Sequence, residues 1–273
     1  MVAWHDGPLA AEWLLLTVVG VFAVEVAKNA SGEIFDFDSG ADQAVAPEDR
    51  SPFSGGKRVL VDGVLTRQQT LWVAAAGYAA GALSGLLICW LREPQVLWLG
   101  VIGMALAFFY QAPPLRLSYR GWGEVAVAVS YGPLICCGTY LVQRGDVPGA
   151  VVAASVPLGI LIAAFLWINE FPDYRADRAA EKRTLVVRLG RRRASRVFAA
   201  VLALAFVCLG YLPLAGVPVG IWAGFIALPA AVRAARVAVD RPEHTAAIIP
   251  AQVNTLRAFV LLAVGSGLGM VLL

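Results

Sequence analysis

The segment VPLGILIAAFLWINEFPDYRAD, from Val156 to Asp177, passes without a break from apolar residues into a polar cluster. A helix needs roughly 20 mostly apolar residues to cross the ~30 Å hydrocarbon core of a bilayer, and the apolar run over residues 147–169 is long enough. Two aspartates, an asparagine and a glutamate stand at its end. Because ionisable groups beside hydrocarbon are costly, they indicate a functional site by default. The segment predicts a membrane helix with a polar site at its mouth.

The composition extends this interpretation to the whole chain. Of the 273 residues, 59% are apolar and 15% are charged, and the mean hydropathy is +0.71, which excludes an ordinary soluble domain. We predict an all-α polytopic membrane bundle that forms a single domain over residues 1–273. The eight predicted spans cover residues 8–28, 70–91, 95–111, 121–143, 147–169, 195–214, 216–236 and 253–273.

Several residue types are predicted to serve packing only. Runs such as AAAGYAAGALSGLL and LLAVGSGLGMVLL are rich in Gly and Ala, which let membrane helices approach closely. His5 and His244 have no neighbours typical of a nucleophile triad. The cysteines lie within spans and lack the spacing of a metal or redox motif, so we expect apolar filling without disulfides; they are Cys89, Cys136, Cys137 and Cys208.

Basic residues are unequally divided between the two ends of the spans. Only Arg92 and Arg144 flank the short turns, whereas the other 20 of the 22 Lys and Arg residues lie near the longer segments 28–67, 116–120, 175–196 and 233–257. The positive-inside rule places those longer segments in the cytoplasm, with both termini on the outer side. The net charge of +3 is too small and too dispersed to predict nucleic-acid binding.

The polar cluster at the end of the opening segment has helical spacing. Asn169, Asp173 and Asp177 are four residues apart, so on a helix they form one ladder of oxygen ligands, each ~6 Å further along the axis. Glu170 and Arg175 are expected to point elsewhere. Oxygen ligands at this spacing suit Mg²⁺, which binds one or two carboxylates, several waters and the phosphate oxygens of a substrate.

A second acidic cluster, NASGEIFDFDSGAD, closes the first predicted span. If that helix continues to about residue 38, Asn29, Glu33 and Asp36 share one face, and Asp42 follows in the loop. Two acidic ladders that face each other would repel, so we expect divalent cations between them. The alternative is two independent, solvated patches at the helix ends.

Basic residues predicted on the same side of the membrane would bind an anionic group held by those cations. Arg and Lys beside carboxylate-bound Mg²⁺ are typical of a diphosphate site. A substrate with this anionic head and a body in lipid is a polyprenyl diphosphate. The run RLGRRRASR that begins at Arg188 is either a topology anchor or part of the substrate site. The other candidate diphosphate ligands are Lys57, Arg58, Arg116, Arg120, Lys182 and Arg183.

Three segments resemble one known family. NEFPDYRADRAAEKRTLVVRLG is similar to the second Asn/Asp-rich motif of the UbiA superfamily of intramembrane prenyltransferases, and YQAPPLRLSYRGWGE and IPAQVNTLRAF resemble its menaquinone-pathway branch, the 1,4-dihydroxy-2-naphthoate prenyltransferases. The resemblance covers about nine-tenths of the chain. It implies a helical bundle around a central cavity with cytoplasmic cap loops and bound Mg²⁺, in a bacterial inner membrane.

The resemblance also implies a reaction, in which the diphosphate leaves and an aromatic acceptor captures the allylic cation. By position, Asp36 and Asp42 match the first motif, and Asn169, Asp173 and Asp177 match the second. Tyr110 and Arg116 match the middle loop. The implied metal ligands are Asn29, Glu33, Asp36, Asp42, Asn169, Asp173 and Asp177, and the implied catalytic residues are Asp36, Asp173, Asp177, Tyr110 and Arg116.

The chain departs from the family pattern in two places. Gly32 and Glu33 stand where the first motif begins with Asn-Asp, and we expect Asn29, one turn earlier, to supply the amide. The family has nine spans, whereas only seven residues precede the first span here. Either the true start lies upstream, or this branch has lost a helix.

In the predicted mechanism, Arg116, Lys57 and Lys182 bind the leaving diphosphate and aromatic faces surround the allylic cation. Glu25 and Lys28, an i, i+3 pair inside the first span, either line the cavity or only neutralise each other. Two alternatives remain open: a membrane terpene cyclase of the same superfamily, and a polyprenyl-lipid transporter or binding protein without chemistry. The candidate aromatic residues are Tyr110, Phe108, Phe109, Trp167 and Tyr131.

Overall fold

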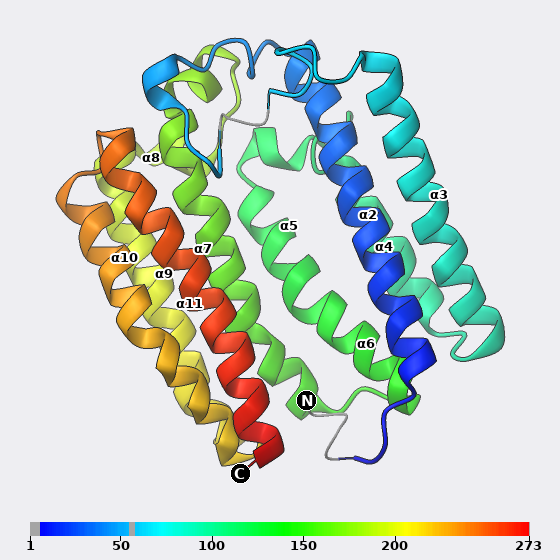
Figure 1. Cartoon of the computed structure of the whole chain (residues 1–273). Coiled ribbons are helices and arrows are strands. Elements are labelled where there is room, and N and C mark those ends of the chain that lie inside the picture. The colour runs from blue at the N-terminus through cyan, green and yellow to red at the C-terminus, as the bar shows by residue number, and fades with distance from the viewer. Residues whose placement is uncertain (1–5, 55–57, 273) are drawn as a thin grey trace.

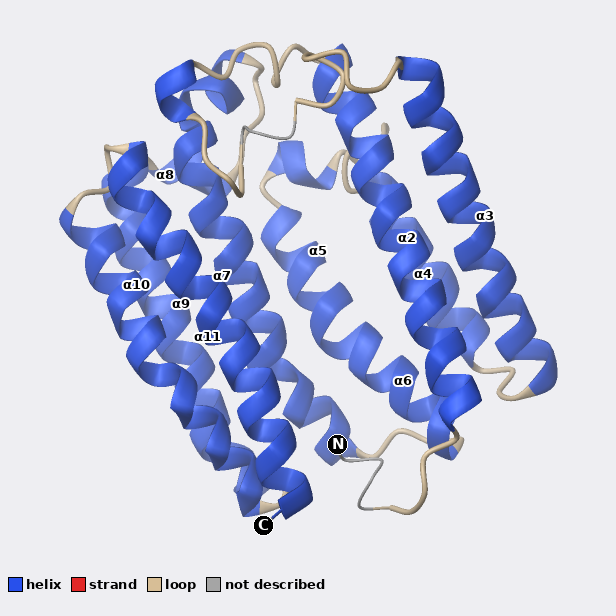
Figure 2. Ribbon diagram, in the orientation of Figure 1, coloured by secondary structure: helices blue, strands red, loops and turns tan. Residues whose placement is uncertain are grey.

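The computed structural model describes residues 6–54 and 58–272, which form helices and loops without a strand (Figure 2). The α-helices are α2 (Ala11–Asp38), α3 (Arg67–Leu91), α4 (Val96–Phe109), α5 (Gly123–Val129), α6 (Ile135–Arg144), α7 (Gly149–Ala179), α8 (Leu185–Leu189), α9 (Arg191–Tyr211), α10 (Leu228–Asp240) and α11 (Thr245–Leu272). Short 3₁₀ segments are η1 (Pro47–Asp49), η2 (Leu117–Arg120), η4 (Leu212–Ala215) and η5 (Val219–Ala227), and η3 (Ser130–Leu134) is a π-helical turn that joins α5 to α6.

Seven helical segments in the described part of the chain are long and apolar enough to cross a membrane. The third predicted span, residues 95–111, is shorter than expected, because α4 has 14 residues and so extends only ~21 Å. The α5–η3–α6 unit and the η5–α10 unit each count as one segment. Trp90 and Leu214 are 83% and 84% exposed, as expected of side chains that face lipid rather than water.

The helices form two halves that meet at α7 (Figure 1). α2 packs on α3 on one side, α9, α10 and α11 pack together on the other, and α7 contacts both α5 and the α9–α11 group. The polar segment after α2 and the segment around α8 lie at one end of the bundle. The N-terminal end of α2 and the C-terminal end of α11 are both at the opposite end of the bundle, as the distribution of basic residues predicts.

Small residues bring helices into close contact, as the Gly- and Ala-rich runs predict. A Cβ added at Gly269 of α11 would lie 2.0 Å from the carbonyl oxygen of Gly220. In α3, a Cβ at Gly81 would lie 2.4 Å from Val24 of α2. The four cysteines are unpaired and buried or half-buried. His244 lies in the α10–α11 loop, and His5 lies outside the described residues.

Candidate active site

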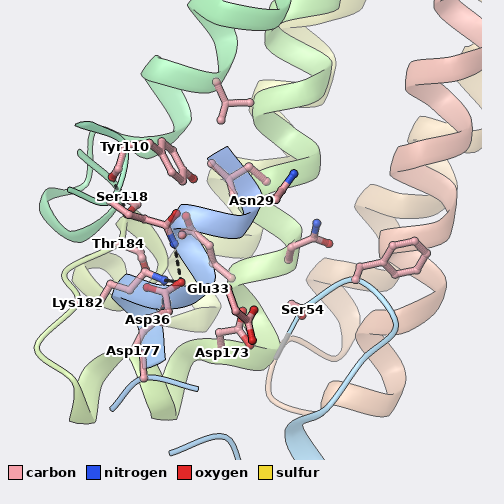
Figure 3. Close-up of a pocket in the computed structure, with 18 of the residues that line it drawn as sticks. Asn29, Glu33, Asp36, Ser54, Tyr110, Ser118, Asp173, Asp177, Lys182 and Thr184 are labelled. Carbon is pink, nitrogen blue, oxygen red and sulfur yellow. Dashed lines mark hydrogen bonds and ion pairs between the residues drawn. The ribbon is translucent and has the colours of Figure 1, made fainter. Parts of the chain in front are cut away.

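A cavity of about 490 Å³ lies between the two halves of the bundle, near the polar loops. α2, α7 and the loop that follows α2 contribute most of its lining, and the loops that follow α4 and α7, together with Val127 of α5 and Tyr131 of η3, supply the rest. Figure 3 shows Glu33 and Asp36 from α2 and Asp173 and Asp177 from α7 around one space. The alternative of two independent acidic patches is therefore excluded.

The first ladder lies on one continuous helix. α2 continues to Asp38, as the spacing argument required, and Asn29, Glu33 and Asp36 all line the cavity. Asp38 instead faces outward, where Arg67 donates to its Oδ2 at 2.7 Å. Helical periodicity thus separates the cavity face of α2 from its exposed face.

Protein donors already hold the carboxylates of this ladder. Asp36 accepts hydrogen bonds from Gln111 Nε2 at 2.6 Å and from Tyr119 OH at 2.7 Å. Glu33 Oε1 accepts the backbone N–H of Leu60 at 3.1 Å. Burial and the charge of Asp36 raise the pKa of Tyr119, so its hydroxyl keeps the proton that it donates.

The second ladder is less completely bonded. Asn169, Asp173 and Asp177 line the cavity from the last turns of α7. Asn169 Oδ1 accepts from Gln252 Nε2 of α11 at 3.1 Å. Asp173 Oδ1 is buried and has no hydrogen-bond partner in the structure. The carboxylate of Asp173 is therefore available to an added cation.

Lys182, from the loop after α7, joins the two ladders. Its Nζ lies 3.5 Å from Asp177 Oδ1 and 3.7 Å from Asp36 Oδ2. Burial opposes the charged form of this lysine, but the two carboxylates outweigh burial and hold its pKa well above the usual range. Lys182 is a permanent positive charge in the cavity lining, where an anionic substrate group would bind.

The loop after α2 adds a further carboxyl group. Asp42 lines the cavity, and its buried Oδ2 lacks a hydrogen-bond partner. Burial, together with repulsion from Asp36 and Glu33, raises the pKa of Asp42 to about 7. Its carboxyl group therefore ionises fully at neutral pH only when positive charge joins the cluster.

These unpaired oxygens fit a magnesium ion that arrives with a substrate. Among the described residues, no three His, Cys, Asp or Glu side chains come together as a ready-made metal site. Mg²⁺ usually takes only one or two carboxylates, and waters and substrate phosphates complete its octahedron. Asp42 and Asp173 fit that role, because each lines the cavity and has a buried oxygen without a hydrogen-bond partner.

The membrane-facing end of the cavity holds a different polar cluster. Lys28 Nζ lies 3.1 Å from Glu25 Oε1, and Tyr131 OH donates to the other oxygen of Glu25. The same ammonium lies 5.5 Å from the ring centre of Tyr110 and 5.8 Å from that of Tyr131. Glu25 and Lys28 neutralise each other. Both also line the cavity, so the two alternatives expected for this pair hold together.

Two of the five aromatic candidates line the cavity, Tyr110 and Tyr131. The structure does not bring the other three there. Phe108 is 42% exposed, Phe109 packs against it, and Trp167 of α7 is buried in the main hydrophobic core. Their α4 and α7 faces turn toward lipid or toward neighbouring helices, a difference that composition alone does not encode.

Phe53 and Phe165 line the cavity and were not singled out from the sequence. Their rings pack edge to face with centroids 5.8 Å apart. Phe165 lies four residues before Asn169, so the helical spacing of the ladder was the signal that would have found it. Phe53 lies in the loop after α2, where spacing carries no such information.

Most of the predicted basic ligands lie outside the cavity lining. Arg58 pairs with Asp62 Oδ1 at 3.1 Å and donates to the carbonyl of Asp42. Arg116 is exposed and stacks on the ring of Tyr119, 5.2 Å from its centre. The structure does not bring either side chain to the cavity, and contact with a diphosphate stays a prediction for both.

Arg120 and Arg183 are also exposed and absent from the lining. Their carbonyl oxygens accept hydrogen bonds from Arg188 at 2.7 and 3.0 Å, so Arg188 fastens the α4–α5 loop to the α7–α8 loop. Lys57 lies outside the described residues. Of the basic candidates whose positions the structure describes, Lys182 is the one in the lining.

The expectation for Glu170 is wrong, whereas that for Arg175 is confirmed. Glu170 is 8% exposed, lines the cavity and lies beside Glu124 of α5. α7 is covered on both sides at this level, so a residue one position from the ladder still faces the interior. Arg175 points outward, 3.6 Å from Glu48 and from Asp49.

Comparisons with known proteins agree with this architecture. A model of the UbiA prenyltransferase family matches residues 1–271. The chain is 33% identical over 239 residues to the 1,4-dihydroxy-2-naphthoate octaprenyltransferase of Mycobacterium tuberculosis, covering 84% of this chain and 78% of that protein. The apo structure of a UbiA homologue from Aeropyrum pernix K1 has a TM-score of 0.69 at 18% identity, covering 94% of this chain and 90% of that one. A UbiA homologue from Archaeoglobus fulgidus, solved with bound GPP and Mg²⁺, has a TM-score of 0.64 at 14% identity, covering 95% and 89%.

Proposed function

Because the chain belongs to the UbiA prenyltransferase family, we propose that this multi-pass membrane protein transfers a prenyl group from a polyprenyl diphosphate to an aromatic acceptor. The observation that carries the proposal is the convergence of the α2 and α7 ladders on one cavity. The names of the relatives support the acceptor class, since the Mycobacterium tuberculosis enzyme acts on a dihydroxynaphthoate. We further propose that the cavity faces the cytoplasm of a bacterium, which the distribution of basic residues supports.

The donor diphosphate binds at the ladders in this proposal. Mg²⁺, held by Asp42 and Asp173 with help from the other carboxylates, would act as a Lewis acid on the leaving diphosphate. Lys182 donates to a phosphate oxygen, an interaction that strengthens as negative charge develops there. Gln111 and Tyr119 keep Asp36 oriented toward the same space.

The bond that breaks joins the allylic carbon to the diphosphate oxygen, and the bond that forms joins that carbon to the acceptor ring. The displaced ring proton leaves afterwards. Tyr110 and Tyr131 provide π faces at the membrane-facing end of the cavity, where they also face Lys28. The surrounding helices exclude water, which would otherwise capture the cation.

One assay separates this proposal from its alternatives. Purified protein is incubated with geranylgeranyl diphosphate and Mg²⁺, with and without 1,4-dihydroxy-2-naphthoate, and diphosphate release and product mass are measured. We expect release only with the acceptor, and loss of release when EDTA removes the metal. Release without an acceptor would indicate a cyclase, and binding without release would indicate a transport or binding protein.

A further inference from the structure

The cavity has two positively charged groups, and the proposed function assigns a ligand to only one of them. Among the residues that the structure describes, Lys28 and Lys182 are the cationic side chains in the lining. Lys182 lies at the ladders, between Asp36 and Asp177. Lys28 comes eight residues before Asp36 on α2, which is ~12 Å along the helix axis. A diphosphate is only two phosphate units long, so one that is bound at the ladders does not reach Lys28.

Lys28 extends away from the ladders, toward the membrane-facing end of the cavity. Its Nζ lies 3.1 Å from Oε1 of Glu25, which is one turn nearer the start of α2, and side chains on a helix point toward its N-terminus. Figure 3 shows Asn29, the neighbour of Lys28 in the chain, on the same side as Tyr110, with Asp177 on the other side. The two cationic groups therefore serve opposite ends of the cavity.

Glu25 does not use up the hydrogen-bonding capacity of Lys28. An ammonium group has three N–H donors, and the one acceptor that the described residues offer to Lys28 is Glu25. Glu25 also accepts from Asn29 Nδ2 at 2.6 Å and from Tyr131 OH, so it is shared among three donors. The Lys28 side chain is 19% exposed and lines the cavity. An anion that enters the cavity can therefore contact the ammonium directly.

Two aromatic rings define which kind of anion fits beside Lys28. Its ammonium lies 5.5 Å from the ring centre of Tyr110 and 5.8 Å from that of Tyr131. The hydroxyl of Tyr131 donates to Glu25, which fixes the position of that ring. A flat aromatic group packs against such rings by offset or edge-to-face contact, and a carboxylate accepts charge-assisted hydrogen bonds from an ammonium. A ligand with both features is an aromatic acid.

We propose that Lys28 binds a carboxylate carried by the aromatic acceptor, so that the cavity selects aromatic acids over neutral aromatic compounds. This inference rests on the proposed function, because it takes the acceptor as the second substrate in this cavity. The donor diphosphate occupies the Lys182 end and the acceptor carboxylate occupies the Lys28 end. The acceptor ring lies between them, beside Tyr110 and Tyr131. Each of the two anionic substrate groups thus has a cation of its own.

A simpler role for Lys28 makes a different prediction. If the lysine only neutralises Glu25, its loss leaves a carboxylate without its cation inside the bundle, which is costly. That cost falls on the protein itself, so it affects every acceptor to the same extent. If Lys28 binds the acceptor, its loss falls selectively on acceptors that carry a carboxylate. The ratio between two acceptors therefore separates the two roles.

The test compares two acceptors that differ only in the carboxylate, 1,4-dihydroxy-2-naphthoate and 1,4-dihydroxynaphthalene, each with geranylgeranyl diphosphate and Mg²⁺. For Lys28→Met we expect the preference for the acid, measured as the ratio of the two kcat/KM values, to fall at least tenfold. Glu25→Gln/Lys28→Met removes both charges and should lose the preference to the same extent. Arg67→Met is the control, because it breaks an exposed ion pair with Asp38 on the outer face of α2.

The outcomes separate this inference from the function on which it rests. An unchanged ratio in both Lys28 variants would overturn the carboxylate site even if prenyl transfer is confirmed. If Lys28→Met fails to fold, the double variant, which leaves no charge without a partner, answers the same question. If wild type transfers no prenyl group, thermal stabilisation by 2-naphthoate and by its neutral amide tests the site without a donor. We expect the acid to stabilise wild type more than the amide does, and an equal preference in the double variant would refute the site.

Discussion

The two acidic ladders face the same cavity but differ in how their oxygens are bonded. On α2, Asp36 accepts from two side chains and Glu33 accepts a loop N–H. On α7, Asp173 has a buried oxygen without a hydrogen bond, and Asp177 has only Lys182, at 3.5 Å. The α2 ladder is held in position by the protein, whereas the α7 ladder is left open.

This difference indicates a division of roles. A buried carboxylate without a partner is costly, and the cost is removed when a cation binds or when the carboxylate takes up a proton. A carboxylate held by Gln111 and Tyr119 keeps its position whether or not a cation is present. We infer that the carboxylates of α2 hold fixed positions in the site, and that the unpaired carboxylate oxygens of α7 provide most of the affinity for metal and diphosphate.

The largest expected effect is that of Asp173→Asn. The substitution preserves volume but removes the charge that a metal needs, so we expect diphosphate release to fall by roughly 10²–10⁴-fold, corresponding to several kcal/mol of Lewis-acid stabilisation. Without Mg²⁺ the variant should melt at or above the temperature of wild type, because an uncompensated buried charge is gone.

Asp38→Asn is the matched control for this experiment. Asp38 lies two residues after Asp36 on α2 but faces outward toward Arg67, and an exposed ion pair of this kind contributes little to stability. Its activity should equal that of wild type. Undiminished turnover in Asp173→Asn would contradict the assignment of the α7 ladder.

Lys182→Met should have the next largest effect, about a hundredfold fall in kcat, because it removes a charge-assisted donor to the leaving group. It also removes the cation between Asp36 and Asp177, so its melting temperature should fall in EDTA and recover partly with Mg²⁺. Arg183→Met is the control, because Arg183 is adjacent in sequence but exposed and outside the lining. A larger loss in that control would show that the exposed arginines reach the substrate.

Tyr119→Phe tests the fixed ladder and should have a smaller effect. It removes one of the two donors to Asp36 and leaves Gln111 in place. Loss of an outer partner of a metal-binding carboxylate typically weakens metal affinity 10- to 100-fold, and we expect the low end of that range. The measurement is the Mg²⁺ concentration that gives half-maximal diphosphate release; an unchanged value would show that Asp36 does not bind the metal.

The same contrast explains how much of the site the sequence predicts. Helical spacing alone places Asn29, Glu33 and Asp36 on one face, and the periodicity of α7 does the same for its ladder. Lys182 is only five residues after Asp177, so the chain cannot carry it far from the ladder. Residues tied to a regular helix were therefore predictable.

Residues that depend on loops and on neighbouring helices were not. Arg188 donates to two backbone carbonyl groups in loops. Carbonyl groups outside regular helices lack a helical N–H partner and accept from whichever donor lies nearby. Glu170 faces the interior because α5 covers that side of α7. Neither fact is encoded in local spacing.

The smallest expected effect belongs to Ser54→Ala, which tests the one held member of the α7 ladder. Gln252 Nε2 donates to Asn169 Oδ1 at 3.1 Å and also contacts Ser54 Oγ at 3.3 Å. Loss of the second contact leaves the first intact, and one neutral hydrogen bond contributes about 1 kcal/mol, so kcat/KM should fall by less than about fivefold. A loss larger than that of Tyr119→Phe would mean that the loop after α2, rather than α7 itself, positions Asn169. The α7 ladder would then also be held in position by the protein, and the contrast between the two ladders would be wrong for Asn169.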